Sequence, residues 1–261
     1  MSDQPSIGVL RHLARSGGTK LTRCLGCMDK VVVLSEVHPA ALRHTNPVWQ
    51  AHEWFGLISP AERAAFERPG ASFVEFVTLA EARARRKGKR LVLRDWAHID
   101  YIGVPYASPT NRPTLIETLA PSFRVHAGVT VRHPLDQWLS LNTLDVIRGR
   151  LSPEAYLAGV RAFTEQIADG PFIRFEDFTR QPMIEARSLC DRLGVSFDPA
   201  FLTRWHAYEK VTGDRKEHAS RGSGRKQIKP MERRAVEPAL LESFRASEDY
   251  REICDRLGYE P

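Results

Sequence analysis

Two short segments of the chain have residue types and spacings that suit the binding of phosphate groups. The first follows an apolar stretch and consists of Arg15, Ser16, Gly17, Gly18, Thr19 and Lys20. Adjacent glycines leave backbone N–H groups open to a ligand at the start of a helix, where the helix dipole favours an anion. Arg15 or Lys20 can neutralise the bound charge, and Ser16 and Thr19 add hydroxyl donors. We predict that one phosphate group binds here.

The second segment places a guanidinium and a hydroxyl eight positions apart, at Arg132 and Ser140. Arg132 closes an apolar run, and Pro134 suits the first turn of a helix. Ser140 then lies about two turns into that helix. Either segment alone is also compatible with plain packing. The two together predict a ligand that is phosphorylated at both ends.

Strand-length apolar runs alternate with longer helical stretches, which is typical of a parallel sheet with helical crossovers. We expect strands at residues 7–13, 31–34, 91–93, 125–131 and 172–175. We expect helices at residues 19–28, 60–67, 73–87, 135–148, 153–168, 183–193 and 237–244. The pattern predicts one α/β domain over residues 1–261 with about five parallel strands. Ligands of such sheets bind at the carboxyl ends of the strands, where both phosphate segments lie.

The charge balance favours an anionic ligand, because 38 Lys and Arg residues face 32 Asp and Glu residues. The basic run at residues 83–90 is the best local argument for a nucleic-acid partner, but no aromatic residues interleave it to stack on bases. It also falls where a helix ends, where cations suit the dipole and water solvates them. We therefore expect no nucleic acid as partner. Without a membrane-length apolar run or an apolar N-terminal signal, we expect a cytoplasmic protein with no transmembrane segment.

The cysteines indicate packing rather than chemistry. Cys24 and Cys27 form a CxxC pair on the helix after the glycines, while Cys190 and Cys254 are isolated. No histidine or second CxxC pair lies at zinc-finger spacing. We expect no metal site.

The two phosphate segments resemble motifs of the sulfotransferases that use 3′-phosphoadenosine 5′-phosphosulfate (PAPS). Residues 15–21 are similar to the 5′-phosphosulfate loop of that family, residues 131–140 to its 3′-phosphate motif, and residues 175–178 to its aromatic-Glu-Asp turn. Residues 214–234 resemble the late loop that closes over the nucleotide, with Ser220, Arg221 and Gly222 inside it. The resemblance extends from residue 7 to about residue 234 and depends on the order and spacing of the motifs.

The resemblance implies a three-layer α/β/α fold like that of the P-loop-containing nucleotide hydrolases. It also implies transfer of a sulfuryl group from PAPS to a hydroxyl or amine of a small-molecule, carbohydrate or lipid acceptor. Arg15 stands at the position of the family's loop lysine, which faces the departing oxygen, and Thr19 would hold the 5′-phosphate. Gly18 departs from the pattern, because cytosolic sulfotransferases usually carry threonine there. Their Lys-Thr-His segment with the catalytic histidine has no literal copy in this sequence.

Two segments can supply the base that takes the acceptor's proton. Residues 35–38 are similar to the Glu-Val-His segment of heparan sulfate 3-O-sulfotransferases, where the glutamate is the base. Strand alternation would place Glu36 and His38 on one side of the chain. The other segment follows the third strand and offers Asp95 and His98. An ion-paired Glu36 and a hydrogen-bonded, partly buried His98 are the structural alternatives.

Two other functions remain open from the sequence, a P-loop kinase for small molecules and a nucleotide-binding protein without catalysis. The Walker spacing GxxxxGK[ST] is absent, because Lys20 directly follows Gly-Gly-Thr, and Thr22 is out of register to hold Mg²⁺. Residues 45–55 and 99–111 are rich in Trp, Tyr, Pro and Asn. They either line an acceptor pocket or pack beneath surface helices, and the oligomeric state is open.

Overall fold

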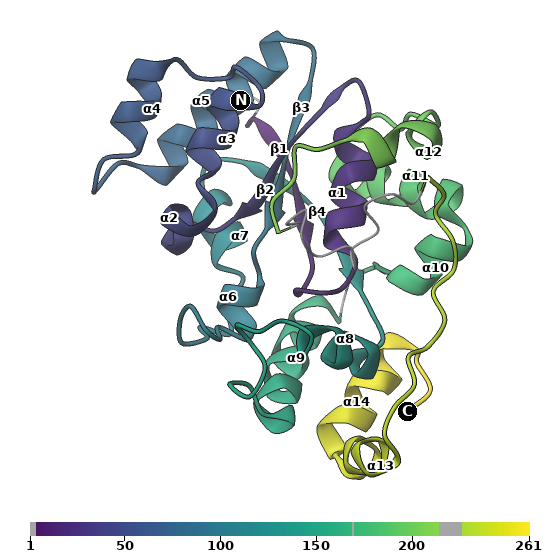
Figure 1. Cartoon of the computed structure of the whole chain (residues 1–261). Coiled ribbons are helices and arrows are strands. Elements are labelled where there is room, and N and C mark those ends of the chain that lie inside the picture. The colour runs from purple at the N-terminus through teal and green to yellow at the C-terminus, as the bar shows by residue number, and fades with distance from the viewer. Residues whose placement is uncertain (1–3, 169, 214–225) are drawn as a thin grey trace.

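Five short apolar segments form one parallel sheet in the order β2-β3-β1-β4-β5 (Figure 1). The computed structural model describes residues 4–168, 170–213 and 226–261. The strands are β1 (Ser6–Arg11), β2 (Val31–Val37), β3 (Arg90–Asp95), β4 (Arg124–Val131) and β5 (Phe172–Arg174). The strand order reverses at β1, which lies between β3 and β4. The carboxyl end of β1 is therefore the switch point at which ligands of open α/β sheets bind.

Helices cover both faces of this sheet. They are α1 (Gly18–Gly26), α2 (Leu42–Thr45), α3 (Pro47–Glu53), α4 (Pro60–Phe66), α5 (Phe73–Arg86), α6 (His98–Tyr101), α7 (Thr114–Leu119), α8 (Pro134–Leu141), α9 (Pro153–Ile167), α10 (Phe175–Arg180), α11 (Pro182–Leu193), α12 (Phe201–Arg204), α13 (Pro238–Ala246) and α14 (Glu248–Leu257). Two short 3₁₀ turns add η1 (Pro39–Ala41) and η2 (Trp205–Ala207).

Alternation along the strands sorts the core into two faces. Leu10 of β1 and Val92 of β3 pack in one cluster with α1 and α11. Their neighbours Val9 and Leu93 pack in another with α3, α5 and α7. On that same face, the end of β4 packs against α8, α9 and α14. This arrangement is the predicted three-layer α/β/α fold (Figure 1).

All five predicted strands are present, but one predicted helix is much shorter than expected. The helix expected at residues 135–148 ends at Leu141 and is followed by turns. The Thr143 hydroxyl donates to the Ser140 carbonyl, and Arg148 donates to the Asn142 carbonyl. Side chains that satisfy backbone carbonyls in this way compete with continued helix. The helices α2, α3, α6, α7, α10, α12 and α14 were not predicted from the sequence.

The basic run at residues 83–90 is tied into the fold. Arg83 forms an ion pair with Glu62, and the ammonium of Lys87 donates to the carbonyls of residues 55 and 56. Lys89 donates to the carbonyl of Asp29. These cations therefore close the end of α5 onto the loops around it, in agreement with their prediction as a helix terminus.

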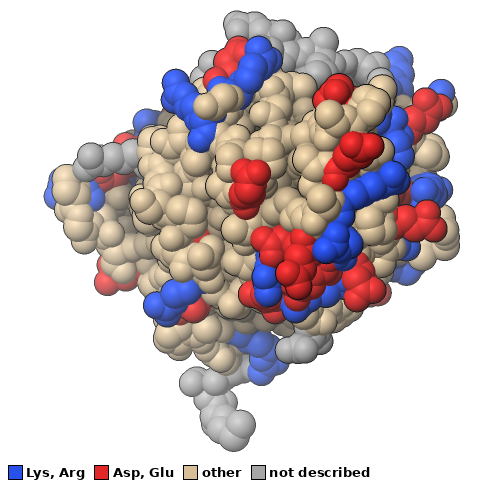
Figure 2. All heavy atoms as spheres, turned by 90° about the horizontal axis from the view of Figure 1, so that it is seen from below, with Lys and Arg blue, Asp and Glu red and all other residues tan. Residues whose placement is uncertain are grey.

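The underside of the molecule carries charges of both signs rather than a continuous basic surface. Seen from below, acidic and basic side chains lie beside one another in one area and are scattered elsewhere (Figure 2). Opposite charges are also paired where α9 contacts α14, because Arg161 of α9 forms ion pairs with Glu165, Asp249 and Glu252. In the part of the chain that the structure describes, no helix combines the length and apolar character needed to span a bilayer.

Candidate active site

The loop between β1 and α1 presents open backbone amides at the start of a helix. Gly17 is the N-cap of α1 with φ 85°, and no side chain caps this end. The first internal bonds run from the amides of Lys20 and Leu21 to the Gly17 carbonyl. Among the described residues, none accepts a hydrogen bond from the amides of Gly17, Gly18 or Thr19. Three donors and the positive end of the helix dipole are therefore available to an anion.

Both glycines are required by their neighbours as well as by a ligand. A Cβ on Gly17 would lie 2.1 Å from the ring of Phe175, and one on Gly18 would lie 1.9 Å from the ring of His12. The imidazole of His12 fills the space that a side chain at position 18 would need. The ammonium of Lys20 makes a cation–π contact with Phe175, with Nζ 5.2 Å from the ring centroid.

The two predicted phosphate segments meet at this loop. The Nε of Arg15 donates to the hydroxyl of Ser140 at 2.8 Å, and a guanidinium nitrogen of Arg132 donates to the Arg15 carbonyl at 3.2 Å. The Gln137 amide donates to the Ala14 carbonyl at 2.7 Å and holds the same two segments together. They meet because β1 and β4 are adjacent parallel strands, so their carboxyl ends lie at one edge of the sheet.

The guanidinium of Arg132 is buried beside carboxylates that other groups already bind. Arg132 is 7% exposed, and burial lowers the pKa of its guanidinium. Asp136 accepts from the Arg234 amide and pairs with Arg233 at 2.8 Å. Glu176 accepts from the amide of residue 133 and from the hydroxyl of residue 259. These carboxylates fix the backbone around Arg132. The arrangement leaves a buried cation at the carboxyl end of β4, which suits a phosphate.

Part of the predicted late loop can be placed. Arg233 and Arg234, at its end, contact Asp136 and so lie beside the 3′-phosphate motif. Ser220, Arg221 and Gly222 lie outside the described residues.

A β-bulge near the end of β2 turns Glu36 toward Arg94 of β3. Leu34 pairs with Leu93 and Val37 with Asp95, so β2 uses one residue more than β3 over the same stretch. Glu36 adopts φ 55°, a left-handed conformation that is strained for a residue with a side chain. Its carboxylate lies 3.2 Å from Arg94 and accepts a hydrogen bond of 2.7 Å from the hydroxyl of Thr212. The Glu36 side chain is 18% exposed.

The bulge overturns one expectation. Alternation was expected to place Glu36 and His38 on one side of the chain. Instead Glu36 binds Arg94, while His38 lies 3.2 Å from the buried carboxylate of Asp100. The His38 ring accepts from the Ala40 amide with its other nitrogen, so it donates to Asp100 and links the end of β2 to α6.

Arg94 is a site residue that the sequence did not single out. Its Nε donates to Nε2 of His12 at 3.0 Å, and one terminal nitrogen donates to the Ser35 hydroxyl at 3.1 Å. His12 therefore carries its proton on Nδ1, which donates to the Leu13 carbonyl at 3.0 Å. Burial and the charge of Arg94 lower the pKa of His12 to about 3, so this imidazole is neutral. Arg94 could have been found from strand alternation, since it shares the face of Val92 and hence of α1.

The two alternative bases are less accessible than Glu36. Asp95 lies on the other face of β3, 3.5 Å from Arg11, and is 1% exposed. Burial raises its pKa to about 6. His98 donates from Nε2 to the Val104 carbonyl at 2.7 Å, and burial lowers its pKa. Its Nδ1 is buried and has no hydrogen-bond partner among the described residues.

An exposed group of rings lies beside the end of β2. The rings of His44, Trp96 and Tyr106 have centroids 5.0–6.1 Å apart and are tilted by 57–67°. The backbone connects this group to the base segment, because the Thr45 hydroxyl donates to the Glu36 carbonyl and the Trp96 amide donates to the carbonyl of residue 37. The other rings of residues 45–55 pack on one another instead.

The four cysteines are free thiols, and three of them are buried. Cys24 packs into the core from α1, Cys27 donates to the Cys24 carbonyl, and burial raises the pKa of both thiols. This supports packing roles. Within residues 4–168, 170–213 and 226–261, no three or more His, Cys, Asp or Glu side chains are grouped to hold a metal ion.

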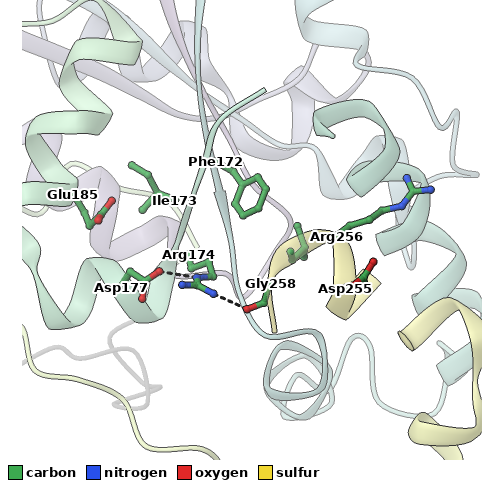
Figure 3. Close-up of a pocket in the computed structure, with 9 residues that line it drawn as sticks. Phe172, Ile173, Arg174, Asp177, Glu185, Asp255, Arg256 and Gly258 are labelled. Atoms are coloured by element: carbon green, nitrogen blue, oxygen red, sulfur yellow. Dashed lines mark hydrogen bonds and ion pairs between the residues drawn. The ribbon is translucent and has the colours of Figure 1, made fainter. Parts of the chain in front are cut away.

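A separate pocket of about 420 Å³ lies at the β5 edge of the sheet (Figure 3). Arg174 reaches across it from β5 and donates to Asp177 and to the carbonyl of Gly258. Its lining includes no residue of the glycine loop, of the end of β2 or of the Arg132–Ser140 segment. We do not assign it to the site.

No protein-family model and no curated protein matches the sequence. The fold does match solved structures. The sulfotransferase domain of the curacin biosynthetic pathway aligns over 99% of this chain and 99% of its own, with a TM-score of 0.65 and 17% sequence identity. The sulfotransferase domain of the Synechococcus PCC 7002 olefin synthase aligns over 100% of this chain and 98% of its own, with a TM-score of 0.67 and 16% identity. The chain therefore has the fold of these sulfotransferase domains.

Proposed function

We propose that this protein is a sulfotransferase that moves a sulfuryl group from PAPS to a hydroxyl or amine of an acceptor. The observation that carries the proposal is the contact between Arg15 and Ser140, because it joins the two predicted phosphate segments in one site. A bisphosphorylated nucleotide is the ligand that uses both. The likeness to sulfotransferase domains supports the fold that this reaction requires.

The residues present fit such a donor. The open amides of Gly17, Gly18 and Thr19 suit the 5′-phosphosulfate, with Ser16 and Lys20 beside them. The buried guanidinium of Arg132 and the hydroxyl of Ser140 suit the 3′-phosphate. When bound, PAPS supplies the activated sulfuryl group. The guanidinium of Arg15, which binds the Ser140 hydroxyl in this structure, would supply positive charge to the leaving oxygen once the 3′-phosphate takes its place at Ser140.

Glu36 is the proposed base. Its carboxylate is partly exposed and already accepts a hydroxyl hydrogen bond of 2.7 Å, which is the geometry that proton abstraction needs. Arg94 orients the carboxylate from the side of the glycine loop. Asp95 is buried on the opposite face, 3.5 Å from Arg11, and Nδ1 of His98 is buried as well. The chain would thus take up the proton of the acceptor at Glu36 while Arg15 neutralises the leaving group.

The acceptor would approach over the rings of His44, Trp96 and Tyr106. Tyr106 is 42% exposed, so the group offers an amphipathic surface rather than a filled core. The rings touch one another and leave no slot between parallel faces. This surface suits an acceptor that lays one face on the rings, and small-molecule, carbohydrate and lipid acceptors all remain within the proposal.

The function is tested by nucleotide preference. Thermal unfolding is followed with 3′-phosphoadenosine 5′-phosphate (PAP), ADP or ATP with Mg²⁺. PAP should raise the unfolding midpoint more than ADP or ATP, because only PAP presents a phosphate to both segments. A greater shift with ATP would instead support the small-molecule kinase. A shift with PAP but no transfer from PAPS to any acceptor would support a nucleotide-binding protein without catalysis.

A further inference from the structure

The hydroxyl that Glu36 holds belongs to the chain itself. Thr212 Oγ1 lies 2.7 Å from Glu36 Oε2 and 2.9 Å from the hydroxyl of Ser35. The Thr212 amide also donates to the Ser35 hydroxyl at 3.1 Å. Backbone and side chain are therefore both anchored on the end of β2. A general base must lie within about 2.6–3.2 Å of the group whose proton it takes, and Thr212 meets this condition.

Thr212 is also close to the phosphate-binding loop, because a single guanidinium links the two. Arg94 donates to the Thr212 carbonyl at 3.5 Å from one end and to His12 at 3.0 Å from its Nε. The His12 ring in turn fills the space beside the Cα of Gly18. Gly18 contributes one of the open amides proposed for the 5′-phosphosulfate. The threonine hydroxyl, the base and the loop thus belong to one contact network.

Ser35 offers a hydroxyl in the same place but is bound differently. It is fully buried and accepts hydrogen bonds from Arg94 and from the amide of Thr212, so its own proton is donated to the Thr212 oxygen 2.9 Å away. No hydrogen bond between its hydroxyl and the Glu36 carboxylate is formed among the described contacts. Of the two hydroxyls, Thr212 is the one in the position of a nucleophile.

We propose that Thr212 occupies the acceptor's position at Glu36 and is itself sulfated when no acceptor is present. The inference rests on the proposed function, since the sulfuryl group comes from PAPS. The Thr212 oxygen forms a bond to sulfur while the bond from sulfur to the bridging phosphate oxygen breaks. The hydroxyl proton passes to Glu36, the electron pair leaves with PAP, and the product is a threonine O-sulfate. An acceptor must displace this hydroxyl, so it competes with the modification.

The first test needs no knowledge of the acceptor. The wild type, Thr212→Val, Thr212→Ser and Glu36→Gln are incubated with PAPS alone, and the modified residue is identified by intact mass and peptide mapping. The wild type and Thr212→Ser should gain one sulfuryl group at position 212, whereas Thr212→Val should gain none. Glu36→Gln should slow the addition by about 10²–10⁴-fold.

Two outcomes would overturn the inference while leaving the proposed function intact. One is a wild type that binds PAP and sulfates an acceptor but never itself. The other is modification that persists in Thr212→Val. Failure to bind PAP would reject the proposed function, and this inference with it.

A second test uses the nucleotide-free protein and asks whether the hydroxyl holds Glu36. Thermal unfolding is measured for Thr212→Val, Glu36→Ala and the double variant, because alanine removes the acceptor that glutamine would keep. Loss of one hydrogen bond should lower the midpoint of Thr212→Val by about 2–4 °C in a protein of this size. The two changes should be less than additive, because they remove the same contact. Full additivity would show that the contact does not form.

Discussion

The Nε of Arg15 lies 2.8 Å from the hydroxyl of Ser140, although the two residues are 125 positions apart in the sequence. Arg15 belongs to the glycine loop after β1, and Ser140 belongs to α8 after β4. Their contact combines two weak sequence motifs into one anion site. Either motif alone is compatible with packing, whereas their meeting at the switch point of the sheet is what a bisphosphorylated ligand requires.

Arg132→Ala should weaken PAP binding by about 10- to 100-fold, because a buried guanidinium forms strong charge-assisted bonds to phosphate. Ser140→Ala should have a smaller effect, since it removes one neutral donor. Both affinities are measured by titration calorimetry. Arg148→Ala is the matched control, because this arginine is 64% exposed and should leave the affinity unchanged. Normal PAP affinity in Arg132→Ala would contradict the assignment of the 3′-phosphate.

Glu36→Gln should reduce sulfuryl transfer by about 10²–10⁴-fold while PAP affinity stays near that of the wild type. The amide keeps the shape of the side chain but cannot take a proton. Asp95→Asn is the matched isosteric change on the other face of β3, and it should reduce transfer less than tenfold in folded protein. The rates are compared with any acceptor that the wild type uses. If Asp95→Asn reduced transfer more than Glu36→Gln, Asp95 rather than Glu36 would be the base.

Gly18→Ala should destabilise the protein and weaken PAP binding, because the new Cβ would meet the ring of His12 at 1.9 Å. Adding His12→Ala should restore part of the lost stability by removing the ring. Gly170→Ala is a suitable control, since its Cβ would meet only one backbone oxygen at 3.8 Å. Chemical unfolding of the four proteins measures these differences. No rescue in the double variant would show that His12 is not the obstacle.

His12 should make the protein less stable as the pH falls from 6.5 toward 3. Its pKa is lowered to about 3 in the folded protein and returns to its ordinary value on unfolding, so the unfolded chain binds the extra proton in this range. The contribution of His12 to the free energy of unfolding is fully present above pH 6.5. Between pH 6.5 and pH 3 it falls by up to about 1.4 kcal/mol per pH unit. His12→Gln keeps an acceptor for Arg94 but does not titrate.

Urea unfolding of the wild type and His12→Gln at pH 7 and pH 5 tests this pH dependence. The free energy of unfolding should fall more steeply in the wild type between the two values. Parallel pH dependences of the two proteins would show that the pKa of His12 is not lowered in the folded protein.

The sequence by itself determined the layout of the molecule. Runs such as residues 31–34 and 125–131 favour strands, and the helical stretches between them favour parallel pairing. Because parallel strands bring their carboxyl ends to one edge, the glycine loop and Arg132 were expected at the same edge, and the adjacency of β1 and β4 in the structure brings them together. Local chemistry of glycine, proline and apolar periodicity was sufficient for this part.

Only the tertiary structure decided which side chains the site presents. Regular alternation would send Glu36 to the face of Leu34, and it is the bulge opposite β3 that turns it to Arg94. The fit of His12 against Gly18 and the arrival of Thr212 at Glu36 are contacts between segments that have no local relationship. Such contacts depend on strand register and side-chain packing in three dimensions, which no spacing of residues along the chain encodes.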